Sequence, residues 1–502
     1  MAVSNAGPRS PDLLSRATLT RVPADCRPRV HDPGIGIVHL GLGAFHRAHQ
    51  AVYTEEAIAA AGGDWGIVAV APRRRALVDT LAAQDHLFSV TSLEDGHGHT
   101  RVVGALAGVR HAPSDPAAVV ALLADPAVRV VTLTVTEKAY RVAAETGTLL
   151  VDDGLRRELA GEAPPASVPG LLTAGLVARA RADAGPLALV SCDNLPGNGR
   201  LLRAVMAQAV ALTGPDADRV AGWMEKNVAF PATMVDRIVP ASTPHTVESA
   251  RAALGVTDHA AVAAEPYRQW VIEDDFPGGR PDWAAAGAVL TTDAAPYERL
   301  KLRTVNGLHS ALAYLGALAG CETIAEALRL PGVRAALERF ISEEIAPSLV
   351  PPDGVCAVTY GHQVLDRFAN AALGHRTLQV AMDGTQKLPQ RILHTMADRR
   401  AAGAAPRWAA LVVAAWMRFA AGTADDGRPL PLDDPLADRV RETIAEAGTA
   451  PAARVDALLR LREVFPPALA ADTVVRELVT GWLDALDRHG VVATLTGAEE
   501  RT

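Results

Sequence analysis

The chain has 502 residues, of which 49% are hydrophobic and 21% charged, and its formal net charge is -8. This length predicts two or more domains, and the composition is typical of a globular protein rather than of a disordered or fibrous one. The excess of acidic side chains excludes the basic footprint that nucleic-acid-binding domains carry. We therefore expect an enzyme-sized globular chain whose partners do not include nucleic acid.

Cysteine usage and the hydropathy pattern indicate a cytoplasmic protein. The four cysteines form no CxxC pair and are too few for a disulfide framework, as is usual in a reducing compartment. Residues 1–22 lack the apolar core of a secretory signal, and the longest apolar run, 408–417, is too short to span a bilayer. We expect no membrane partner, and the sequence leaves a monomer and a dimer both open.

The first half of the chain alternates strand-like and helix-like segments. Short apolar or β-branched runs, typical of buried strands, lie at 34–41, 65–72, 128–136 and 186–194. Helix-like patterns follow the first two of these runs, at 44–61 and 73–84. This alternation predicts βαβ units and a parallel sheet with both faces covered by helices.

From about Tyr297 onward the pattern is mainly helical, with breaks rich in Gly, Pro and Asp. The expected helices are 301–320, 323–330, 332–344, 408–421, 434–447 and 473–486. We therefore expect an α/β domain over residues 1–294 and a mostly α-helical domain over residues 295–502.

The segment HLGLGAFHRAHQ (39–50) closes the first expected strand and opens the first expected helix. Gly41 and Gly43 allow a sharp turn and a close approach of the backbone to a pyrophosphate, which amide groups at the helix N-terminus would bind. His46 takes the place of the third glycine of G-x-G-x-x-G, where it either contacts the cofactor or packs. The position after a buried strand favours a dinucleotide site, with a plain strand–helix turn as the alternative.

The end of the second expected strand carries Arg73, Arg74 and Arg75 and no acidic residue. A strict NAD site usually has an Asp or Glu here for the adenosine ribose, whereas an arginine can contact the 2′-phosphate of NADP. The alternative is that these arginines form the solvated first turn of a helix. We expect NAD to bind, because both cofactors share the pyrophosphate, and NADP stays open.

Lys301, Asn306 and His309 lie at i, i+5 and i+8 of one expected helix, within an arc of roughly 140°. Burial would disfavour the charged form of Lys301, so that its amine could take a proton from a substrate hydroxyl. Asn306 could donate a hydrogen bond to the reacting oxygen, and His309 could orient that oxygen. The alternative is a surface lysine beside an Asn/His pair of the core.

Two rival chemistries involve the same segments. Tyr297 and Lys301 form the Y-x-x-x-K pair of short-chain dehydrogenases, but those enzymes are usually single α/β domains, and this pair opens the helical half. His46 and His49 are one helical turn apart and could bind a metal, but a catalytic zinc needs three protein ligands and an open position. We therefore predict that the reaction needs no metal.

Ordered motifs along the chain resemble those of the mannitol dehydrogenase family, the polyol-specific long-chain dehydrogenases. These motifs are GLGAFHRAHQ (41–50), TEKAY (136–140), SCDNLPGNG (191–199), FPATMVDRIVP (230–240), EPYRQWVIEDDF (265–276), KLRTVNGLHS (301–310) and MDGTQKLPQR (382–391). The resemblance implies an α/β Rossmann-type dinucleotide-binding domain followed by a mostly α-helical substrate domain. It also implies NAD(P)-dependent, metal-independent chemistry through a lysine.

Carried over position by position, the resemblance implies a set of catalytic roles. Lys301 resembles the general acid/base of the family, and Glu298 resembles a glutamate that relays or gates the proton of that lysine. Asn194 and Asn306 resemble the two donors that hold the reacting oxygen. His309 resembles a residue that binds and orients the polyol.

The resemblance also implies substrate and cofactor contacts. Asp236 and Lys387 resemble substrate-binding residues, although Asp236 could instead pair with Arg237, and Lys387 could be a loop charge. The implied cofactor contacts are Gly41, Gly43, Phe45, Arg47 and Glu137, and we add His46 and Arg73 from their places in the turn and at the strand end.

Within the family, the stretches 82–96, 374–391 and 414–436 resemble bacterial fructuronate reductases (D-mannonate oxidoreductases) more than mannitol 2-dehydrogenases. Gln379 stands where mannitol 2-dehydrogenases tend to place an arginine, and we expect it to contact the substrate. Because of this difference, the mannitol specificity of those enzymes does not carry over directly to this chain.

We therefore expect an NAD(P)-dependent oxidoreductase that interconverts a C2 secondary alcohol and its ketone on an open-chain sugar acid or polyol. Fructuronate and mannonate are the first expectation, and mannitol and fructose the second. For a sugar acid, Lys387, assisted by Arg376 or His375, would bind the carboxylate. A non-catalytic nucleotide-binding sensor is the alternative from another class, and the intact lysine, asparagine and histidine set argues against it.

Overall fold

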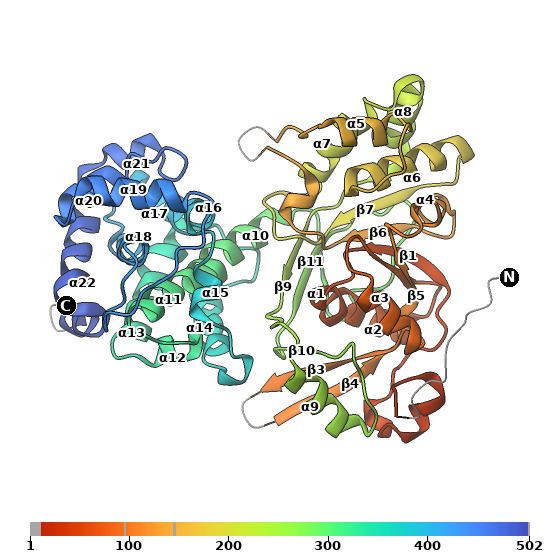
Figure 1. Cartoon of the computed structure of the whole chain (residues 1–502), viewed down its shortest axis with the longest axis horizontal. Coiled ribbons are helices and arrows are strands. Elements are labelled where there is room, and N and C mark those ends of the chain that lie inside the picture. Colours follow the sequence, from red (N-terminus) through yellow and green to blue (C-terminus); the bar gives the residue numbers. More distant parts are fainter. Residues whose placement is uncertain (1–11, 95–96, 144–146, 500–502) are drawn as a thin grey trace. The chain divides into compact units, whose positions relative to one another are not determined.

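The computed structural model describes residues 12–94, 97–143 and 147–499 and divides the chain into two compact units, Met1–Ala295 and Pro296–Thr502 (Figure 1). We call them unit 1 and unit 2. No helix among the described residues is both long and apolar enough to cross a membrane.

Unit 1 is built around a sheet of six parallel strands in the order β5-β2-β1-β6-β7-β8. The strands are β1 (Ile35–Leu40), β2 (Gly66–Ala71), β5 (Leu106–His111), β6 (Val130–Leu133), β7 (Leu187–Ser191) and β8 (Val228–Ala229). Numbered along this sheet alone, the order is 3-2-1-4-5-6, which is the doubly wound order of dinucleotide-binding domains. The prediction of a parallel α/β sheet is therefore confirmed.

Helices cover both faces of this sheet, because successive strand residues point to opposite sides and both sides are apolar. In β1, Ile37 and Val38 belong to different hydrophobic clusters, one on each face. The first face carries α1 (Ala44–Ala48), α2 (Gln50–Ala61) and α3 (Ala76–Ala83). The second face carries α4 (Pro116–Ala124), α6 (Val168–Ala182) and α7 (Asn198–Val210) (Figure 1).

Two three-stranded sheets complete unit 1, and the sequence did not predict them. One has the order β10-β3-β4 and the other β12-β11-β9. Their strands are β3 (Phe88–Glu94), β4 (His97–Val103), β9 (Thr233–Asp236), β10 (Val262–Ala264), β11 (Gln269–Glu273) and β12 (Val289–Thr291). The remaining helices of unit 1 are α5 (Asp153–Leu159), α8 (Ala217–Asn227) and α9 (Pro244–Leu254). Phe88 and Trp270 from these sheets join the same cluster as α2, so α1 and α2 lie between layers of strands.

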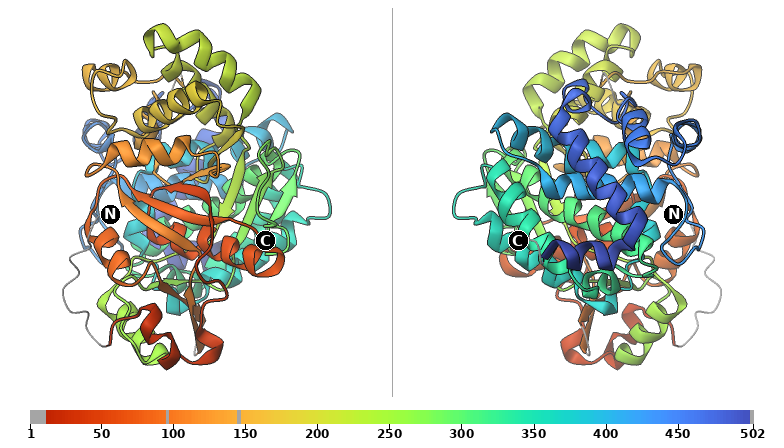
Figure 2. Two further views of the ribbon diagram at one scale, coloured as in Figure 1. Left: turned by 90° about the vertical axis from the view of Figure 1, so that its right-hand side faces the viewer. Right: turned by 90° about the vertical axis from the view of Figure 1, so that its left-hand side faces the viewer.

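Unit 2 is helical. Its helices are α10 (Ala295–Lys301), α11 (Gly307–Leu318), α12 (Ile324–Arg329), α13 (Val333–Phe340), α14 (Ala357–Phe368), α15 (Thr377–Ala381), α16 (Gly384–Leu388), α17 (His394–Ala401), α18 (Arg407–Ala420), α19 (Ala437–Ala447), α20 (Pro451–Leu458), α21 (Pro467–Ala471) and α22 (Thr473–Glu499). The central pair, α11 and α18, is buried at almost every position and packs together. The outer helix α22 packs on α18 and bends at Gly490, whose φ of 70° interrupts the helix (Figure 2).

Several expected helices differ from the observed ones: the one expected over 332–344 passes into a π turn at Ile341–Ile345, the one expected over 473–486 runs on to Glu499, and three others differ at the candidate site. The helix expected over 44–61 breaks at His49, where φ is -126° and ψ is -86°. The helix expected over 73–84 begins only at Ala76, after the three arginines. The helix expected from Lys301 contains a π turn over Leu302–Asn306, in which hydrogen bonds span five residues rather than four. A regular α-helix was therefore the wrong expectation at each of these points.

Glu344 closes the N-terminus of the buried helix α18. Its carboxylate accepts the backbone N–H groups of Trp408 at 2.6 Å and Ala409 at 2.9 Å, which have no partner within the helix. Burial raises the pKa of Glu344 from 4.5 to about 7, although the two N–H groups act in the opposite direction. The folded chain therefore holds this proton more tightly than the unfolded chain does.

We predict that Glu344 makes the protein less stable as the pH rises. A raised folded-state pKa contributes stability that is complete below the unfolded value and is lost as the pH rises through about 7. The change is about 2–4 kcal/mol, and Glu344→Gln should remove most of it. Thermal midpoints measured at pH 5, 7 and 8.5 would therefore fall less steeply in Glu344→Gln than in the wild type.

Glu343→Gln is the matched control. Partial burial opposes the shift, but hydrogen bonds from Arg339 and Trp408 lower the pKa of Glu343, so its titration lies below this pH range. The Glu343 variant should keep the wild-type slope. An equal slope in wild type and Glu344→Gln would contradict the assignment.

Candidate functional site

The glycine turn, Gly41 to Gly43, follows β1 directly. Gly41 has a φ of +109°, and a Cβ placed on it would lie 2.0 Å from the carbonyl oxygen of Thr134, so that only glycine fits. Its N–H donates to the carbonyl of Val70 at 2.9 Å, which fixes the turn to the end of β2. The space beside Gly43 is open, since the nearest atom to an added Cβ is 3.6 Å away. The fold therefore leaves the Cβ position of Gly43 unobstructed, unlike that of Gly41.

His46, at the third glycine position, packs against β1. Its ring stacks on that of His39 with a centroid distance of 3.4 Å and an interplanar angle of 12°. Burial lowers the pKa of His39 to about 3 and that of His46 well below its usual value, so both rings are neutral. Neither ring nitrogen of His46 has a hydrogen-bond partner within the described chain. The stacked rings of His39 and His46 therefore set the distance between β1 and α1, where a glycine in place of His46 would allow closer packing.

Arg47 and Phe45 support the first turn of helix from inside unit 1. Arg47 donates from Nε to the carbonyl of Gly43 at 3.2 Å and from Nη1 to the carbonyl of Ala260. The ring of Phe45 stacks on that of His49 at 4.9 Å. At the end of β2, Arg73 is exposed. The structure thus places Arg47 in a bracing position, and the cofactor roles of these residues stay predictions.

Glu137 and Asn194 follow the two strands next to β1. Parallel pairing aligns Leu40 of β1 with Leu133 of β6, and Leu133 with Ser191 of β7. Since neighbouring strands are about 4.8 Å apart, the glycine turn and the turns that carry Glu137 and Asn194 share one edge of the sheet. The carboxyl edge of a parallel sheet, where the strand order reverses, is the usual dinucleotide site.

Asp193 holds this edge together, and the sequence did not single it out. Its carboxylate accepts the N–H groups of Val135 at 3.0 Å and Thr136 at 2.9 Å, and the hydroxyl of Tyr140 at 2.7 Å. Burial raises the pKa of Asp193, against the effect of these donors. The signal was present in the sequence, because Asp193 lies in SCDN beside Asn194 and Tyr140 closes TEKAY.

Asp236 is buried at the end of β9, opposite Gln269 of β11. The backbone carbonyl of Gln269 lies 2.9 Å from Nε2 of His49. Arg237 donates to the backbone carbonyls of Ala48 and, at 3.0 Å, of Glu265. Unit 1 therefore brings the helix after the glycine turn and the strand that carries Asp236 into contact.

In unit 2 the π turn connects Lys301 and Asn306. Lys301 is the last residue of α10, Asn306 is the last residue of the π turn, and both side chains are buried. A turn with five-residue hydrogen bonds brings residues i and i+5 closer to one face than a regular α-helix would. Within the described chain, Nδ2 of Asn306 has no hydrogen-bond partner. This amide is therefore a buried donor that an oxygen atom of a bound ligand could satisfy.

His309 lies one turn further along, in α11. Its ring stacks on Phe368 at 4.7 Å and meets His375 edge-on at 4.6 Å. Burial, followed by the positive charges around it, lowers the pKa of His309 well below its usual value. No partner for its Nε2 lies in the described part of the chain. His309 is therefore a neutral hydrogen-bonding ring.

A cationic pair, Lys387 and Arg391, lies near His309. Lys387 donates from Nζ to the carbonyls of Met382 at 2.5 Å and Val380 at 3.4 Å, and burial lowers its pKa to about 8. Arg391 is half-buried and donates to the hydroxyl of Ser310 at 3.1 Å. The sequence did not single out Arg391, although it stands in the quoted motif MDGTQKLPQR.

The other predicted residues of unit 2 are less enclosed. Arg376 and Gln379 are exposed, on and just before α15. Tyr297 and Glu298 are half-buried on α10. Lys301 and Asn306 are therefore buried and Lys387 is half-buried, whereas Arg376 and Gln379 are exposed.

Residues suited to metals are scattered. Over 12–94, 97–143 and 147–499, no group of three or more His, Cys, Asp or Glu side chains could hold a metal ion. His46 and His49 are taken up separately, His46 by its stack on His39 and His49 by the carbonyl of Gln269.

Comparison with known proteins identifies both units. A model of the mannitol dehydrogenase Rossmann domain matches residues 35–285, and one of the mannitol dehydrogenase C-terminal domain matches residues 293–486. The chain is similar to the D-mannonate oxidoreductase of Escherichia coli (strain K12), with 39% identity over 90% of this chain and 93% of that one. It is 37% identical to the mannitol 2-dehydrogenase of Cereibacter sphaeroides, over 92% of this chain and 95% of that one.

A solved structure is similar over nearly the whole length. The Pseudomonas fluorescens mannitol 2-dehydrogenase, in a ternary complex with NAD and D-mannitol, matches with a TM-score of 0.85 and 32% identity, covering 97% of this chain and 100% of that one. These matches confirm the family resemblance and the architecture predicted from the sequence.

We predict that Gly41→Ala and Gly43→Ala act in different ways. An alanine at Gly41 meets the Thr134 carbonyl and a φ of +109°, so it should destabilise unit 1 and lower its melting temperature by several degrees. An alanine at Gly43 meets no close atom, so the fold should persist. The affinity for the dinucleotide should fall, because the added methyl group would keep the pyrophosphate away from the backbone. Melting curves and calorimetric titration with NADH test both effects. Unchanged NADH affinity in a folded Gly43→Ala would contradict a dinucleotide role for this turn.

Proposed function

Because the chain belongs to the mannitol dehydrogenase family, we propose that it interconverts a secondary alcohol and a ketone at C2 of an open-chain sugar acid. Fructuronate and mannonate are the proposed pair, NAD is the proposed cofactor, and NADP is left open. The place of action proposed is the cytoplasm. The observation that carries this proposal is the π-interrupted helix that bears His309 and the buried side chains of Lys301 and Asn306.

Lys301 is the proposed general acid/base. When the alcohol is oxidised, the C2 hydroxyl gives its proton to the neutral amine of Lys301, and the carbon loses a hydride. A bound nicotinamide dinucleotide supplies the acceptor for that hydride. In the reverse direction the ammonium of Lys301 returns the proton to the forming alkoxide. Glu298, three residues earlier on α10, is the proposed relay for that proton.

Amide donors are proposed to stabilise the charge that develops on the reacting oxygen. The Nδ2 of Asn306, which has no hydrogen-bond partner in the described chain, is suited to this role. A donor that is already fixed in position needs no reorganisation when the negative charge develops. Asn194 is proposed as a second donor. The neutral ring of His309 is proposed to orient the substrate with Asp236, since it adds no competing positive charge.

The cofactor proposal rests on the edge formed by β1, β6 and β7. Gly41 and Gly43 are proposed to face the pyrophosphate, with Phe45, His46 and Arg47 behind them. Glu137, at the end of the neighbouring strand, is proposed as a further contact. Arg73 is exposed at the end of β2, and the sequence has no acidic residue at this strand end. An acidic residue there would disfavour the 2′-phosphate of NADP.

The cations of unit 2 favour a charged substrate. Lys387 and Arg391 are both half-buried, and the carboxylate of Asp383 lies 4.0 Å from Nζ of Lys387. A substrate carboxylate would receive charge-assisted hydrogen bonds there, worth about 1.5–3 kcal/mol each. Gln379 and Arg376 are proposed to contact the hydroxyls and the acid from α15.

Mannitol and fructose are the second candidate pair. The relatives include a mannitol 2-dehydrogenase at 37% identity beside a D-mannonate oxidoreductase at 39%. These two values are too close to decide between the substrates. The charge of the substrate is the difference that an experiment can use.

We predict that Lys301→Ala loses about 3–6 kcal/mol of transition-state stabilisation while NADH affinity stays nearly unchanged. Wild-type oxidation should rise with pH as Lys301 loses its proton, and reduction should fall. Steady-state rates across pH 6–10 and NADH titrations measure these effects. Lys226→Ala is the control, because this lysine is exposed on α8. If Lys301→Ala kept a tenth of the turnover, the role would pass to Tyr297, to be tested as Tyr297→Phe.

We predict that kcat/KM for fructuronate exceeds that for fructose by at least about tenfold, and that Lys387→Met removes most of this preference. The preference should also fall as the pH rises through about 8, where Lys387 loses its charge. Rates at 340 nm with fructuronate, tagaturonate and fructose measure it. Gln386→Met, an exposed neighbour on α16, is the control. Efficient reduction of fructose without activity on fructuronate would establish the second candidate pair instead.

A further inference from the structure

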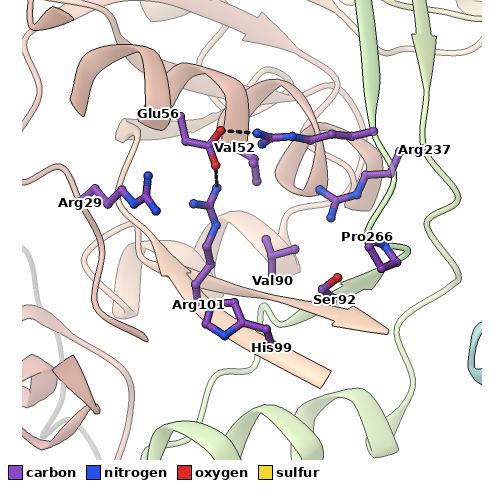
Figure 3. A pocket seen from close by; sticks show the side chains of 10 residues that line it. Arg29, Val52, Glu56, Val90, Ser92, His99, Arg101, Arg237 and Pro266 are labelled. Atoms are coloured by element: carbon purple, nitrogen blue, oxygen red, sulfur yellow. Dashed lines mark hydrogen bonds and ion pairs between the residues drawn. The ribbon is translucent and has the colours of Figure 1, made fainter. Parts of the chain in front are cut away.

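Unit 1 contains a cavity of about 300 Å³ whose wall is rich in arginine (Figure 3). Its lining includes Arg29, Arg101, Arg237 and Arg268, against the single carboxylate of Glu56. None of these residues belongs to the set proposed above for the cofactor or the substrate. We propose that this cavity is a binding site for a small molecule that carries a phosphate or a carboxylate group.

Two antiparallel strands and a helix build part of the wall. Val90 and Ser92 of β3 lie opposite Arg101 and His99 of β4 in the antiparallel register, and residues two apart on a strand share a face. Glu56 of α2 lies on the other side of the cavity (Figure 3). Arg101 therefore extends from a strand, Arg237 and Arg268 lie directly beside the ends of β9 and β11, and Arg29 lies in an irregular segment.

Only part of the positive charge is neutralised within the wall. Arg101 lies 2.9 Å from Glu56 Oε1, and Arg268 donates to Oε2 of the same carboxylate, so two guanidinium groups share one negative charge. Arg237 donates only to backbone carbonyls, those of Glu265 and Ala48. The exposed guanidinium of Arg29 has no carboxylate partner in the described chain.

The carboxylates just behind the wall are already engaged by backbone donors. Glu55 accepts the N–H of Gly104 at 2.8 Å, and Glu265 accepts that of Ile238 at 2.6 Å. Positive neighbours also act on one another, since burial, followed by the charge of Arg268, lowers the pKa of Arg237 to about 10. Glu265 and Glu55 offset part of the charge of Arg237 and Arg101, but within the lining itself four guanidinium groups face the single carboxylate of Glu56.

One donor in the wall is unsatisfied. Nη2 of Arg101 is buried and close to Glu56, yet it forms no hydrogen bond in the described chain, because its direction is unsuitable. The ion pair with Glu56 therefore leaves this donor poorly aligned, and an oxyanion in the cavity would offer it a better-placed acceptor. The planar fork of arginine also fits two oxygens of a phosphate or carboxylate at once.

The remaining lining suits the rest of a small metabolite. Val52, Val90 and Pro266 offer an apolar surface for carbon atoms, while Ser92 and His99 offer hydrogen-bonding groups. The volume lies at the lower end of the range for small-molecule sites. A phosphorylated or carboxylated sugar has this combination of one anionic group and a short hydroxylated carbon chain.

Binding is tested on the full chain by calorimetry and thermal shift, with inorganic phosphate, glucose 6-phosphate and glucuronate as probes. Each is titrated to about 10 mM, with and without saturating NADH, so that occupation of the glycine turn is recognised. We expect saturable binding of at least one probe that persists with NADH and weakens as salt is raised. Binding of the phosphates alone identifies a phosphate ligand, and binding of glucuronate alone identifies a carboxylate ligand.

Variants locate the binding. Arg29→Met and Arg101→Met should each weaken it by about tenfold or more, whereas Arg157→Met, an exposed arginine on α5, should leave it unchanged. Because Arg29 is exposed, its variant remains informative even if Arg101→Met fails to fold. Absence of saturation with all three probes would overturn the proposal, and so would equal affinity in the wild type and Arg29→Met. Turnover does not enter this test, so its outcome is independent of the proposed reaction.

Discussion

Parallel pairing of β1 with β6, and of β6 with β7, is the constraint on which the candidate cofactor edge depends. The register places Leu40, Leu133 and Ser191 side by side, so all three strands end at the same level. The chain then turns, and the glycine turn, Glu137 and Asn194 occur within four residues of these ends. Residues that are more than one hundred and fifty positions apart in the sequence therefore lie at the same edge of the sheet, although their side chains need not touch.

The sequence predicted those parts of the molecule that repeat a local pattern. Continuous apolar runs marked the buried parallel strands, and the glycine turn marked the first strand end. It failed where distant groups decide the local structure. The helix after the turn breaks at His49, whose ring meets the carbonyl of Gln269, 220 residues away. The strand β4 was missed because His99 and Arg101 line a polar cavity, so that Val103 is the apolar residue left on that face and no alternating apolar pattern appears.

Lysine is rare in this chain, and its distribution separates two kinds of positive charge. Of 49 Lys and Arg residues only four are lysine, and two of these, Lys301 and Lys387, lie in unit 2. An arginine keeps its proton under all physiological conditions, so it can hold an anion but cannot exchange a proton. Arg47, which is buried, and Arg237 and Arg391, which are half-buried, accordingly donate to oxygen atoms of the fold. The spacing of Lys301, Asn306 and His309 also fits a regular α-helix, so this spacing alone could not predict the π turn.

The strand order has a consequence for synthesis of the chain on the ribosome. β1 pairs on one side with β2, which emerges soon after it, and on the other side with β6, which emerges about ninety residues later. During that interval the apolar edge of β1 has no neighbour, and an open strand edge invites pairing with other chains. Translation of β6 is therefore the earliest moment at which the centre of the sheet can close, and the nascent chain is most in need of protection before it.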